Sequence, residues 1–405
     1  MEKERVVIIG GGQAGSQAAI SLRQGKFDGA IDLFCAENVL PYQRPPLSKA
    51  YLKGEMEAAR LFFRPMDFYE GQNIRVHVGA AIASLDPIGQ AVVTVDGERH
   101  GYDKLLLATG APPRRLTCPG ADLDEIYYLR SLPDADALSA TLSANGRIAI
   151  IGAGYIGLEV AAVLRGAGRD VTVLEAADRP LARVASEPVS AFYERRHREA
   201  GVDLRLGAMV EGFLGDDVVR GVRLADGEEI ECCAALVGIG AAPAVSLAAG
   251  AGLETDNGIV VDDHARTSDP NIWSAGDCAN FPSPRYGRRI RLESVPNAIE
   301  QAKAVAANML GGDVTYDALP WFWSDQYDVK LQTAGLFEGY DGRVVRGDPD
   351  ENSFSVWYLK DGAVLAVDAI NDPGAFMMGK KFIMSGKKPS ADQLADTSLD
   401  LKTLL

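Results

Sequence analysis

The chain has 405 residues, more than one typical domain, and its 47% hydrophobic and 24% charged residues are close to globular averages. Its formal net charge of −15 argues against a protein that binds nucleic acid or an anionic membrane over its whole surface. The five cysteines show neither Cys-x-x-Cys nor metal-type spacing, which indicates free thiols in a reducing compartment.

The N-terminal residues run directly into an apolar, strand-like stretch at 6–9. We therefore expect no targeting segment and a cytoplasmic protein. The uncharged stretch 232–253 is long enough to cross a bilayer, but glycine and proline interrupt it. It predicts a buried parallel strand, a Gly-rich turn and a short helix.

The chain contains an internal duplication, RVVIIGGGQAGS at 5–16 and RIAIIGAGYIGL at 147–158. In each copy an apolar run precedes a Gly-rich turn and a helical pattern, and a second apolar strand follows at 31–34 and 171–174. Two βαβ units, and hence two parallel sheets, are predicted. The matched glycines are Gly10, Gly12 and Gly15, and Gly152, Gly154 and Gly157.

These glycines have separate physical uses. The first permits the tight turn, the second lets the backbone approach a pyrophosphate, and the third lets helix and strand pack closely. The helix N-terminus adds a positive dipole end that favours an anion. Two such units predict two bound dinucleotides.

A carboxylate at the end of the second strand of each unit is expected to bind a ribose. Glu175 has this position in the second copy, and its charge would repel a 2′-phosphate by about 4 kcal/mol at 4 Å and an effective dielectric near 20. The second copy therefore predicts NADH in preference to NADPH, although a solvated strand-end acid remains the alternative. The first copy has Cys35 there, so Glu37, the nearest carboxylate, is assigned to the other ribose.

Gly276-Asp277 closes a later strand and precedes an Ala-rich helix that we expect from about 297 to 310. Asp277 can bind a polyol hydroxyl, as the ribityl chain of a flavin requires, or it can cap the helix. The Ala-Thr-Gly crossover that contains Thr109 and Gly110 favours the first reading, and so identifies the first dinucleotide as FAD. A comparable crossover at 235–243 contains Gly240 and leaves the second unit.

The fold class is therefore α/β, with two Rossmann-like dinucleotide-binding domains. Residues 1–112 and 243–320 form the FAD-binding domain, and 113–242 form the NAD-binding domain inserted into it. Residues 321–405 have aromatic, alternating runs and predict a small α+β domain with an antiparallel sheet.

Five segments carry a resemblance to a known family: YQRPPLSK (42–49), GAGYIGLE (152–159), AGDCA (275–279), ESVPNA (293–298) and WFWSDQY (321–327). They resemble the putidaredoxin reductase-like NADH:ferredoxin reductases of bacterial oxygenase systems, which are glutathione-reductase-type flavoproteins. The resemblance extends from residue 5 to about 385. It implies that electrons pass from NADH through FAD to a [2Fe-2S] ferredoxin that feeds a monooxygenase or dioxygenase.

The resemblance also implies which residues hold the two cofactors. Several relatives have an acid where this chain has Ala36, which leaves the ribose assignment to Glu37 open. The FAD set is Gly10, Gly12, Ala14, Gly15, Ala36, Glu37, Arg44, Lys49, Ile82, Thr109, Gly110, Arg130, Asp277, Val295 and Trp323. The NAD set is Gly152, Gly154, Ile156, Gly157, Glu159, Glu175, Arg183, Gly240 and Glu293.

Four residues are implied in the redox steps. Lys49 would lie near flavin N5, paired with Glu159, and would stabilise the anionic reduced flavin. Tyr155 would cover the flavin face until nicotinamide displaces it. Trp323 would lie on the side that faces the iron–sulfur partner. An exposed lysine, a packed aromatic ring and a core tryptophan are the respective alternatives.

The implied partner is a small acidic ferredoxin, so an acidic reductase needs a locally positive docking face. Docking is expected near Trp323, with opposed charges speeding the encounter. One basic cluster comprises Arg285, Arg288, Arg289 and Arg291, and a second comprises Lys380, Lys381, Lys387 and Lys388. Either cluster can instead be a solvated face.

Two other functions use the same scaffold. Disulfide or peroxide reductases have a cysteine near the flavin, but the corresponding segment, 41–49, has none. A redox or interaction flavoprotein resembling apoptosis-inducing factor shares the Arg-Pro-Pro-Leu-Ser-Lys segment. Slow reoxidation of its reduced flavin–NAD complex would distinguish it from a ferredoxin reductase.

Overall fold

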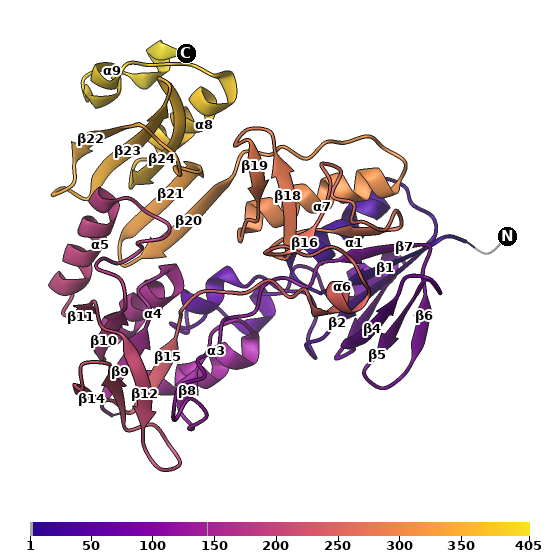
Figure 1. Ribbon diagram of the computed structural model, residues 1–405, viewed down its shortest axis with the longest axis horizontal. Coiled ribbons are helices and arrows are strands. Elements are labelled where there is room, and N and C mark those ends of the chain that lie inside the picture. The colour runs from indigo at the N-terminus through magenta and orange to yellow at the C-terminus, as the bar shows by residue number, and fades with distance from the viewer. Residues whose placement is uncertain (1–2, 144) are drawn as a thin grey trace. The chain divides into compact units, whose positions relative to one another are not determined.

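The computed structural model describes residues 3–143 and 145–405, which form two compact units (Figure 1). Unit 1 comprises Met1–Gln43, Ala58–Pro112 and Ala241–Pro320, and unit 2 comprises Arg44–Glu57, Pro113–Gly240 and Trp321–Leu405. Each unit contains one copy of the Gly-rich repeat. Residues 44–57 and 321–405 belong to unit 2, so the two units do not coincide with the predicted FAD-binding, NAD-binding and C-terminal domains. The division into domains by cofactor remains a prediction.

Unit 1 is built on a parallel sheet with strand order β17-β7-β1-β2-β3. A three-stranded sheet, β4-β5-β6, and a second one, β16-β18-β19, accompany it. The sheet strands are β1 (Arg5–Ile9), β2 (Ala30–Cys35), β3 (Ile74–Val78), β7 (Lys104–Leu107) and β17 (Ile272–Ser274). The other elements are α1 (Gln13–Gln24), η2 (Ala58–Arg60), α2 (Met66–Gly71), β4 (Ile82–Asp86), β5 (Ala91–Thr94), β6 (Arg99–Gly101), α6 (Ser246–Gly250), β16 (Ile259–Val260), β18 (Ala279–Ser283), β19 (Arg288–Ile290) and α7 (Val295–Met309).

The parallel strands of unit 1 are apolar because both faces of their sheet are covered. β1 is buried from Val6 onward, and α1 packs against α7. The Ala-rich helix expected from about 297 to 310 is α7, which begins at Val295 and is capped by Ser294. A hairpin, β18–β19, lies between Asp277 and this helix and was not predicted. Asp277 is therefore not the cap of that helix.

Unit 2 repeats the parallel sheet with strand order β11-β10-β9-β15-β8. The chain between β11 and β15 forms a separate antiparallel sheet with strand order β12-β13-β14. The elements are η1 (Pro45–Ser48), β8 (Ile126–Tyr127), α3 (Leu132–Ser139), η3 (Ala140–Leu142), β9 (Arg147–Ile151), α4 (Tyr155–Gly166), β10 (Asp170–Glu175), α5 (Glu187–Glu199), β11 (Asp203–Leu206), β12 (Val210–Leu214), β13 (Gly221–Leu224), β14 (Glu229–Glu231) and β15 (Ala234–Val237).

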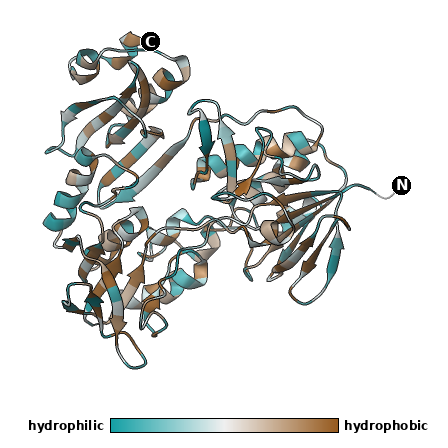
Figure 2. Cartoon of the chain, in the orientation of Figure 1, coloured by the Kyte–Doolittle hydropathy of each residue, from teal (hydrophilic) through white to brown (hydrophobic). Residues whose placement is uncertain are grey.

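The two parallel sheets correspond strand for strand. Ile9 pairs with Phe34 across β1 and β2, and Ile151 pairs with Leu174 across β9 and β10. Figure 2 shows the strands of both sheets as mainly hydrophobic and α5 as mainly hydrophilic. The 232–253 stretch forms the buried parallel strand β15, a turn and the short helix α6, as predicted.

The C-terminal part of unit 2 is an antiparallel sheet with order β20-β21-β24-β23-β22, against which α8 packs (Figure 1). This agrees with the predicted small α+β domain. Its elements are β20 (Trp321–Gln326), β21 (Val329–Gly335), β22 (Gly342–Asp348), β23 (Ser353–Lys360), β24 (Ala363–Ile370), α8 (Pro373–Ser385), α9 (Ala391–Ala395) and η4 (Leu401–Leu404).

None of the helices in the described ranges is both long enough and apolar enough to span a membrane.

Candidate cofactor and redox sites

The Gly-rich turn of unit 1 brings backbone into close contact with backbone. A Cβ on Gly10 would lie 2.1 Å from the carbonyl oxygen of Ala108, and one on Gly15 would lie 1.9 Å from that of Gly10. A Cβ on Gly12, in contrast, would meet nothing within 4 Å, and no side chain caps the α1 N-terminus there. The positive end of the α1 dipole is therefore accessible, and a pyrophosphate can bind there.

The Gly276 turn lies directly beside this helix end. A Cβ on Gly276 would come within 3.1 Å of the Ala14 Cβ, and the Gly276 N–H donates to Gln301 at 2.8 Å. The φ of +83° at Gly276 also favours glycine. The structure thus places Asp277 next to the first Gly-rich turn, although the sequence separates them by most of the chain.

Arg291 holds the Asp277 segment in place. Its guanidinium donates to the Asp277 carbonyl at 2.9 Å and pairs with Glu293 at 2.7 Å. Glu293, assigned to the nicotinamide nucleotide, is therefore already engaged with one of the arginines assigned to docking.

At the end of β2, the thiol of Cys35 fills the space beside Gly11, where a Cβ would lie 2.3 Å from the sulfur. Burial, and then the charge of Glu37, raises the pKa of this thiol to about 12, so it stays protonated at neutral pH. Glu37 accepts a hydrogen bond from the Tyr42 hydroxyl at 2.5 Å. Ala36, between Cys35 and Glu37, offers no side-chain acceptor.

The remaining predicted FAD residues of unit 1 lie at element ends and in the crossover. Thr109 donates to the Ala244 carbonyl at 2.8 Å, and the Ala244 N–H donates to the Gly110 carbonyl at 2.9 Å. The two crossover segments are therefore joined to each other. Ile82 begins β4 and is half-buried, and Val295 is the first residue of α7.

The Gly-rich turn of unit 2 repeats this geometry. A Cβ on Gly152 would lie 2.5 Å from the Gly238 carbonyl, and one on Gly157 would lie 2.2 Å from the Gly152 carbonyl. Gly154 begins α4 without a side-chain cap, and Ile156 in the first turn is 47% exposed. An exposed apolar residue at an uncapped helix end is consistent with a surface that a ligand covers.

Glu175 is held against this turn. One carboxylate oxygen accepts from the Ala153 N–H at 2.7 Å and the other from the Ala177 N–H at 2.9 Å. Each oxygen has a lone pair left, so the group can still accept from ribose hydroxyls. The structure also brings Arg183 to Gly240, where a Cβ would lie 3.0 Å from the guanidinium.

Within unit 2 the predicted redox residues come together in pairs. Lys49 and Glu159 form an ion pair of 2.6 Å, with 19% and 3% of the side chains exposed. Tyr155 packs on Phe322, with ring centroids 4.7 Å apart. Arg44, which precedes η1, donates to the Arg130 carbonyl at 2.6 Å. Neither Lys49 nor Tyr155 is a freely exposed side chain.

Trp323 is half-buried on β20 and lies 5.7 Å from Trp321 between ring centroids. The Lys380 ammonium lies over the Trp321 ring at 5.2 Å and over the Phe376 ring at 5.4 Å. Lys381 is exposed within α8, and Lys387 and Lys388 are exposed just beyond its end. We call these four lysines the lysine patch.

The arginine cluster of unit 1 is more constrained. Arg285 pairs with Asp317 at 3.6 Å, and Arg289 donates to the carbonyls of Val261 and Asn280. Arg291 is only 11% exposed, while Arg288 is exposed on β19. Much of this cluster therefore stabilises unit 1 itself.

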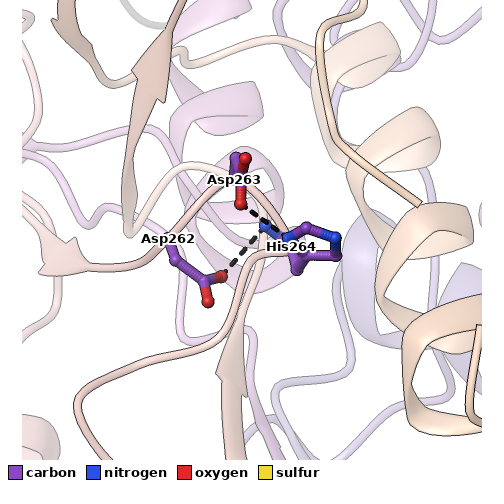
Figure 3. A group of neighbouring side chains, drawn as sticks. All are labelled: Asp262, Asp263 and His264. Carbon is purple, nitrogen blue, oxygen red and sulfur yellow. Dashed lines mark hydrogen bonds and ion pairs between the residues drawn. The ribbon is translucent and has the colours of Figure 1, made fainter. Parts of the chain in front are cut away.

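The three groups in the described ranges that come closest to a metal site are Asp262, Asp263 and His264 (Figure 3). Both ring nitrogens of His264 are engaged, one by Asp263 at 2.6 Å and the other by Asp313 at 2.8 Å. These carboxylates raise the pKa of His264. The arrangement is an ion-pair network, and it leaves no ring nitrogen for an ion.

Sequence reasoning missed two hydroxyl groups. Ser48 and Ser324 each donate to the Glu159 carboxylate at 2.6 Å. Ser324 occupies an inward-facing position of an alternating strand, where a polar residue is unusual, and this was the available signal. Its partner, 165 residues away, could not be identified from spacing.

With two equivalent dinucleotide turns and a buried ion pair established, the class of protein follows from comparison with known families. Residues 4–302 match the pyridine nucleotide-disulphide oxidoreductase family, and residues 321–405 match the reductase C-terminal family. The chain belongs to the pyridine nucleotide-disulphide oxidoreductase family.

Individual relatives indicate which members of this family the chain is similar to. The chain is 46% identical to the 5,5′-dehydrodivanillate O-demethylase ferredoxin reductase subunit of Sphingobium, with 98% of this chain and 97% of that protein covered. It is 44% identical to putidaredoxin reductase of Pseudomonas putida, with 99% and 97% covered. The solved covalent putidaredoxin reductase–putidaredoxin complex matches with a TM-score of 0.97 at 44% identity, covering 100% and 98% of the two chains.

The protein is thus an oxidoreductase that uses FAD and NAD(H). The residues present fit both groups. Each unit offers an uncapped helix N-terminus behind a Gly-rich turn, which suits a pyrophosphate. In unit 1 the Asp277 turn adjoins that helix, as a ribityl chain requires, and in unit 2 Glu175 ends β10 beside the Gly-rich turn with lone pairs left for ribose hydroxyls.

Replacing Gly276 by alanine is predicted to lower FAD retention, because the new methyl would crowd Ala14 at the α1 N-terminus. Gly287→Ala is the matched control, since Gly287 also has a positive φ, of 60°, but a Cβ there meets nothing within 4 Å. The measurement is the FAD-to-protein ratio by absorbance after gel filtration. Equal FAD loss in both variants would show that backbone strain alone is responsible.

Proposed function

We propose that the protein is an NADH:ferredoxin reductase whose electrons pass to the [2Fe-2S] ferredoxin of an oxygenase system. The observation that carries this proposal is the Lys49–Glu159 ion pair of 2.6 Å. Lys49 belongs to the segment 41–49, where disulfide-reducing relatives have a cysteine. In this chain the segment has no cysteine. The relatives named for ferredoxins cover nearly the whole chain, the antiparallel sheet included.

Bound FAD converts the two-electron hydride donor NADH into a source of single electrons, which an iron–sulfur cluster requires. The protein supplies orientation and charge. Lys49 would provide a fixed positive charge that favours reduced flavin, and Glu159, which pairs with Lys49, would orient the nicotinamide. Tyr155 would cover the flavin until nicotinamide binds, and Trp323 would lie on the side from which electrons leave.

The preferred donor is NADH. Glu175 is fixed by two backbone N–H groups and cannot swing away from a ligand without losing both hydrogen bonds. A 2′-phosphate would therefore meet a charge of the same sign. Arg183, whose guanidinium lies beside Gly240, is assigned to the nicotinamide nucleotide as well.

Replacing Glu175 by glutamine is predicted to lower the preference for NADH over NADPH by about 30-fold. This figure corresponds to about 2 kcal/mol, the Coulomb repulsion at an effective dielectric near 20 halved for solvent. The measurement is the ratio of kcat/KM for the two nucleotides. Glu229→Gln, at an exposed acid of β14, is the control. An unchanged ratio would exclude Glu175 as the discriminating charge.

The ferredoxin docks on the side of unit 2 that carries Trp323 and the lysine patch. Lys380 is held over Trp321, so positive charge and aromatic surface are adjacent. Met377 and Met384 on the same helix are 51% and 69% exposed and add apolar contact area. An acidic partner would be attracted by the lysines and would bury the apolar residues. The arginine cluster stays a second, separately testable docking site.

The double replacement of Lys380 and Lys381 by alanine is predicted to raise the KM for ferredoxin severalfold at low salt and to weaken its salt dependence. Flavin reduction by NADH should not change. Lys303→Ala, at an exposed lysine of α7, is the control, and Arg288→Ala tests the arginine cluster. If Arg288→Ala alone raises the KM, docking belongs to the arginine cluster.

The function itself is tested by anaerobic mixing of the holoenzyme and NADH with a [2Fe-2S] ferredoxin, a disulfide or peroxide. Rapid ferredoxin reduction that survives alkylation of the half-buried thiols Cys118 and Cys233 is the expected result, because no thiol takes part. Cys35 and Cys232 are buried with pKa values raised to about 12 and should resist alkylation. Turnover with disulfide or peroxide alone, lost on alkylation, would contradict the proposal.

A further inference from the structure

Side-chain donors occupy both oxygens of the buried Glu159 carboxylate. Lys49 and the Ser48 hydroxyl each reach Oε2 at 2.6 Å, and the Ser324 hydroxyl reaches Oε1 at 2.6 Å. Among the described residues, Ser324 is the one that donates to Oε1. Lys49 is also within 3.4 Å of the Ser48 hydroxyl and of the Pro45 carbonyl.

This arrangement explains how the carboxylate can be buried. A buried charge is tolerated where a partner charge and hydrogen bonds compensate it. The ammonium of Lys49 supplies the charge, and the two serines supply the remaining hydrogen bonds. Because they bond different oxygens, the serines also fix the rotation of the carboxylate about its last bond. Glu159 is therefore held in one orientation.

Successive side chains of a strand point to opposite sides, so the two faces of β20, which carries Ser324, contact different residues. On one face, Phe322 packs on Tyr155 at 4.7 Å, Ser324 bonds Glu159 at 2.6 Å and Gln326 bonds the buried His197 at 2.8 Å. This face of β20 therefore contacts helices α4 and α5.

The opposite face of β20 carries the tryptophans. Trp321 and Trp323 lie 5.7 Å apart, and Lys380 covers Trp321. One strand thus connects the carboxylate assigned to hydride transfer with the aromatic residues assigned to electron exit. Ser324 is the polar contact between the strand and that carboxylate.

From this geometry we infer that Ser324, assisted by Ser48, is a positioning residue for hydride transfer that acts through Glu159. The inference rests on the roles of Lys49 and Glu159 in the proposed function. Ser324 fixes Oε1, so that Oε2 and Lys49 remain aligned. It also sets the position of Glu159 relative to β20, and hence relative to the strand on which the electrons leave.

Ser324→Ala is expected to lower the limiting rate of flavin reduction by NADH about tenfold, which corresponds to about 1.4 kcal/mol. The NADH concentration at half-maximal rate should change little, because the Gly-rich turn and Glu175 bind the nucleotide elsewhere. Stopped-flow absorbance at several NADH concentrations, without ferredoxin, separates the two quantities.

The matched control is Ser355→Ala. Ser355 is also fully buried in the same antiparallel sheet, but it accepts from Trp357 at 3.1 Å and does not contact Glu159. Both variants remove a buried hydroxyl, so any general loss of packing or stability is common to them. The inference predicts slow flavin reduction in Ser324→Ala only, and recovery in Ser324→Thr, which restores the hydroxyl.

Two readouts do not depend on turnover. In a dye-coupled titration without NADH, Ser324→Ala should shift the flavin midpoint potential to a more negative value, because the charge of Glu159 is less compensated. Acylation of Lys49, followed by mass spectrometry, should be faster in the variant than in the parent, because its partner carboxylate is no longer held. Ser48→Ala should shift both readouts in the same direction and serves if Ser324 variants do not fold.

Equal rates, potentials and Lys49 acylation in Ser324→Ala, Ser355→Ala and the parent would overturn the inference. A slowdown of equal size in both alanine variants would do the same, because it would indicate a packing effect. Failure of the parent to reduce ferredoxin would contradict the proposed function, but would leave these ferredoxin-free measurements interpretable.

Discussion

The architecture depends on the close approach of backbone to backbone at the two Gly-rich turns. The carbonyls of Ala108 and Gly238 occupy the space that a side chain on Gly10 or Gly152 would need. This approach sets where α1 and α4 begin, and therefore where two positive helix ends face open space. The dinucleotide sites follow from that placement. The redox residues follow as well, since Tyr155 and Glu159 lie on the first turns of α4.

Features encoded locally were predictable from the sequence. The turns, their strands and the place of Glu175 at the end of β10 follow from spacing, because a βαβ unit is a continuous segment. The strand register confirms that Cys35 and Glu175 are equivalent, each following the residue paired with Ile9 or Ile151. The antiparallel character of the C-terminal region was equally readable from its alternating pattern.

Features that depend on tertiary contacts were not predictable in the same way. The pairing of Lys49 with Glu159 came from family resemblance. The alternating pattern of β20 could have singled out Ser324 as a buried polar residue, but not its partner Glu159, which lies 165 residues away. The hairpin between Asp277 and α7 was not predicted, although the Ala-rich helix that follows it was. The role of each cluster of basic residues was also not predictable from the sequence. Arg289 and Arg291 donate to backbone carbonyls, whereas Lys381 and Lys387 are exposed. Sequence spacing does not distinguish a structural arginine from an exposed lysine.

In the proposed function, the protein is a converter in which a two-electron donor enters through one Gly-rich unit and single electrons leave along β20. The most direct test of this claim is the stoichiometry of an anaerobic titration of holoenzyme and excess oxidised [2Fe-2S] ferredoxin with NADH, followed by absorbance. The account predicts two reduced clusters for each NADH oxidised, with no free thiol consumed. A ferredoxin that stays oxidised while the flavin is fully reduced would contradict it.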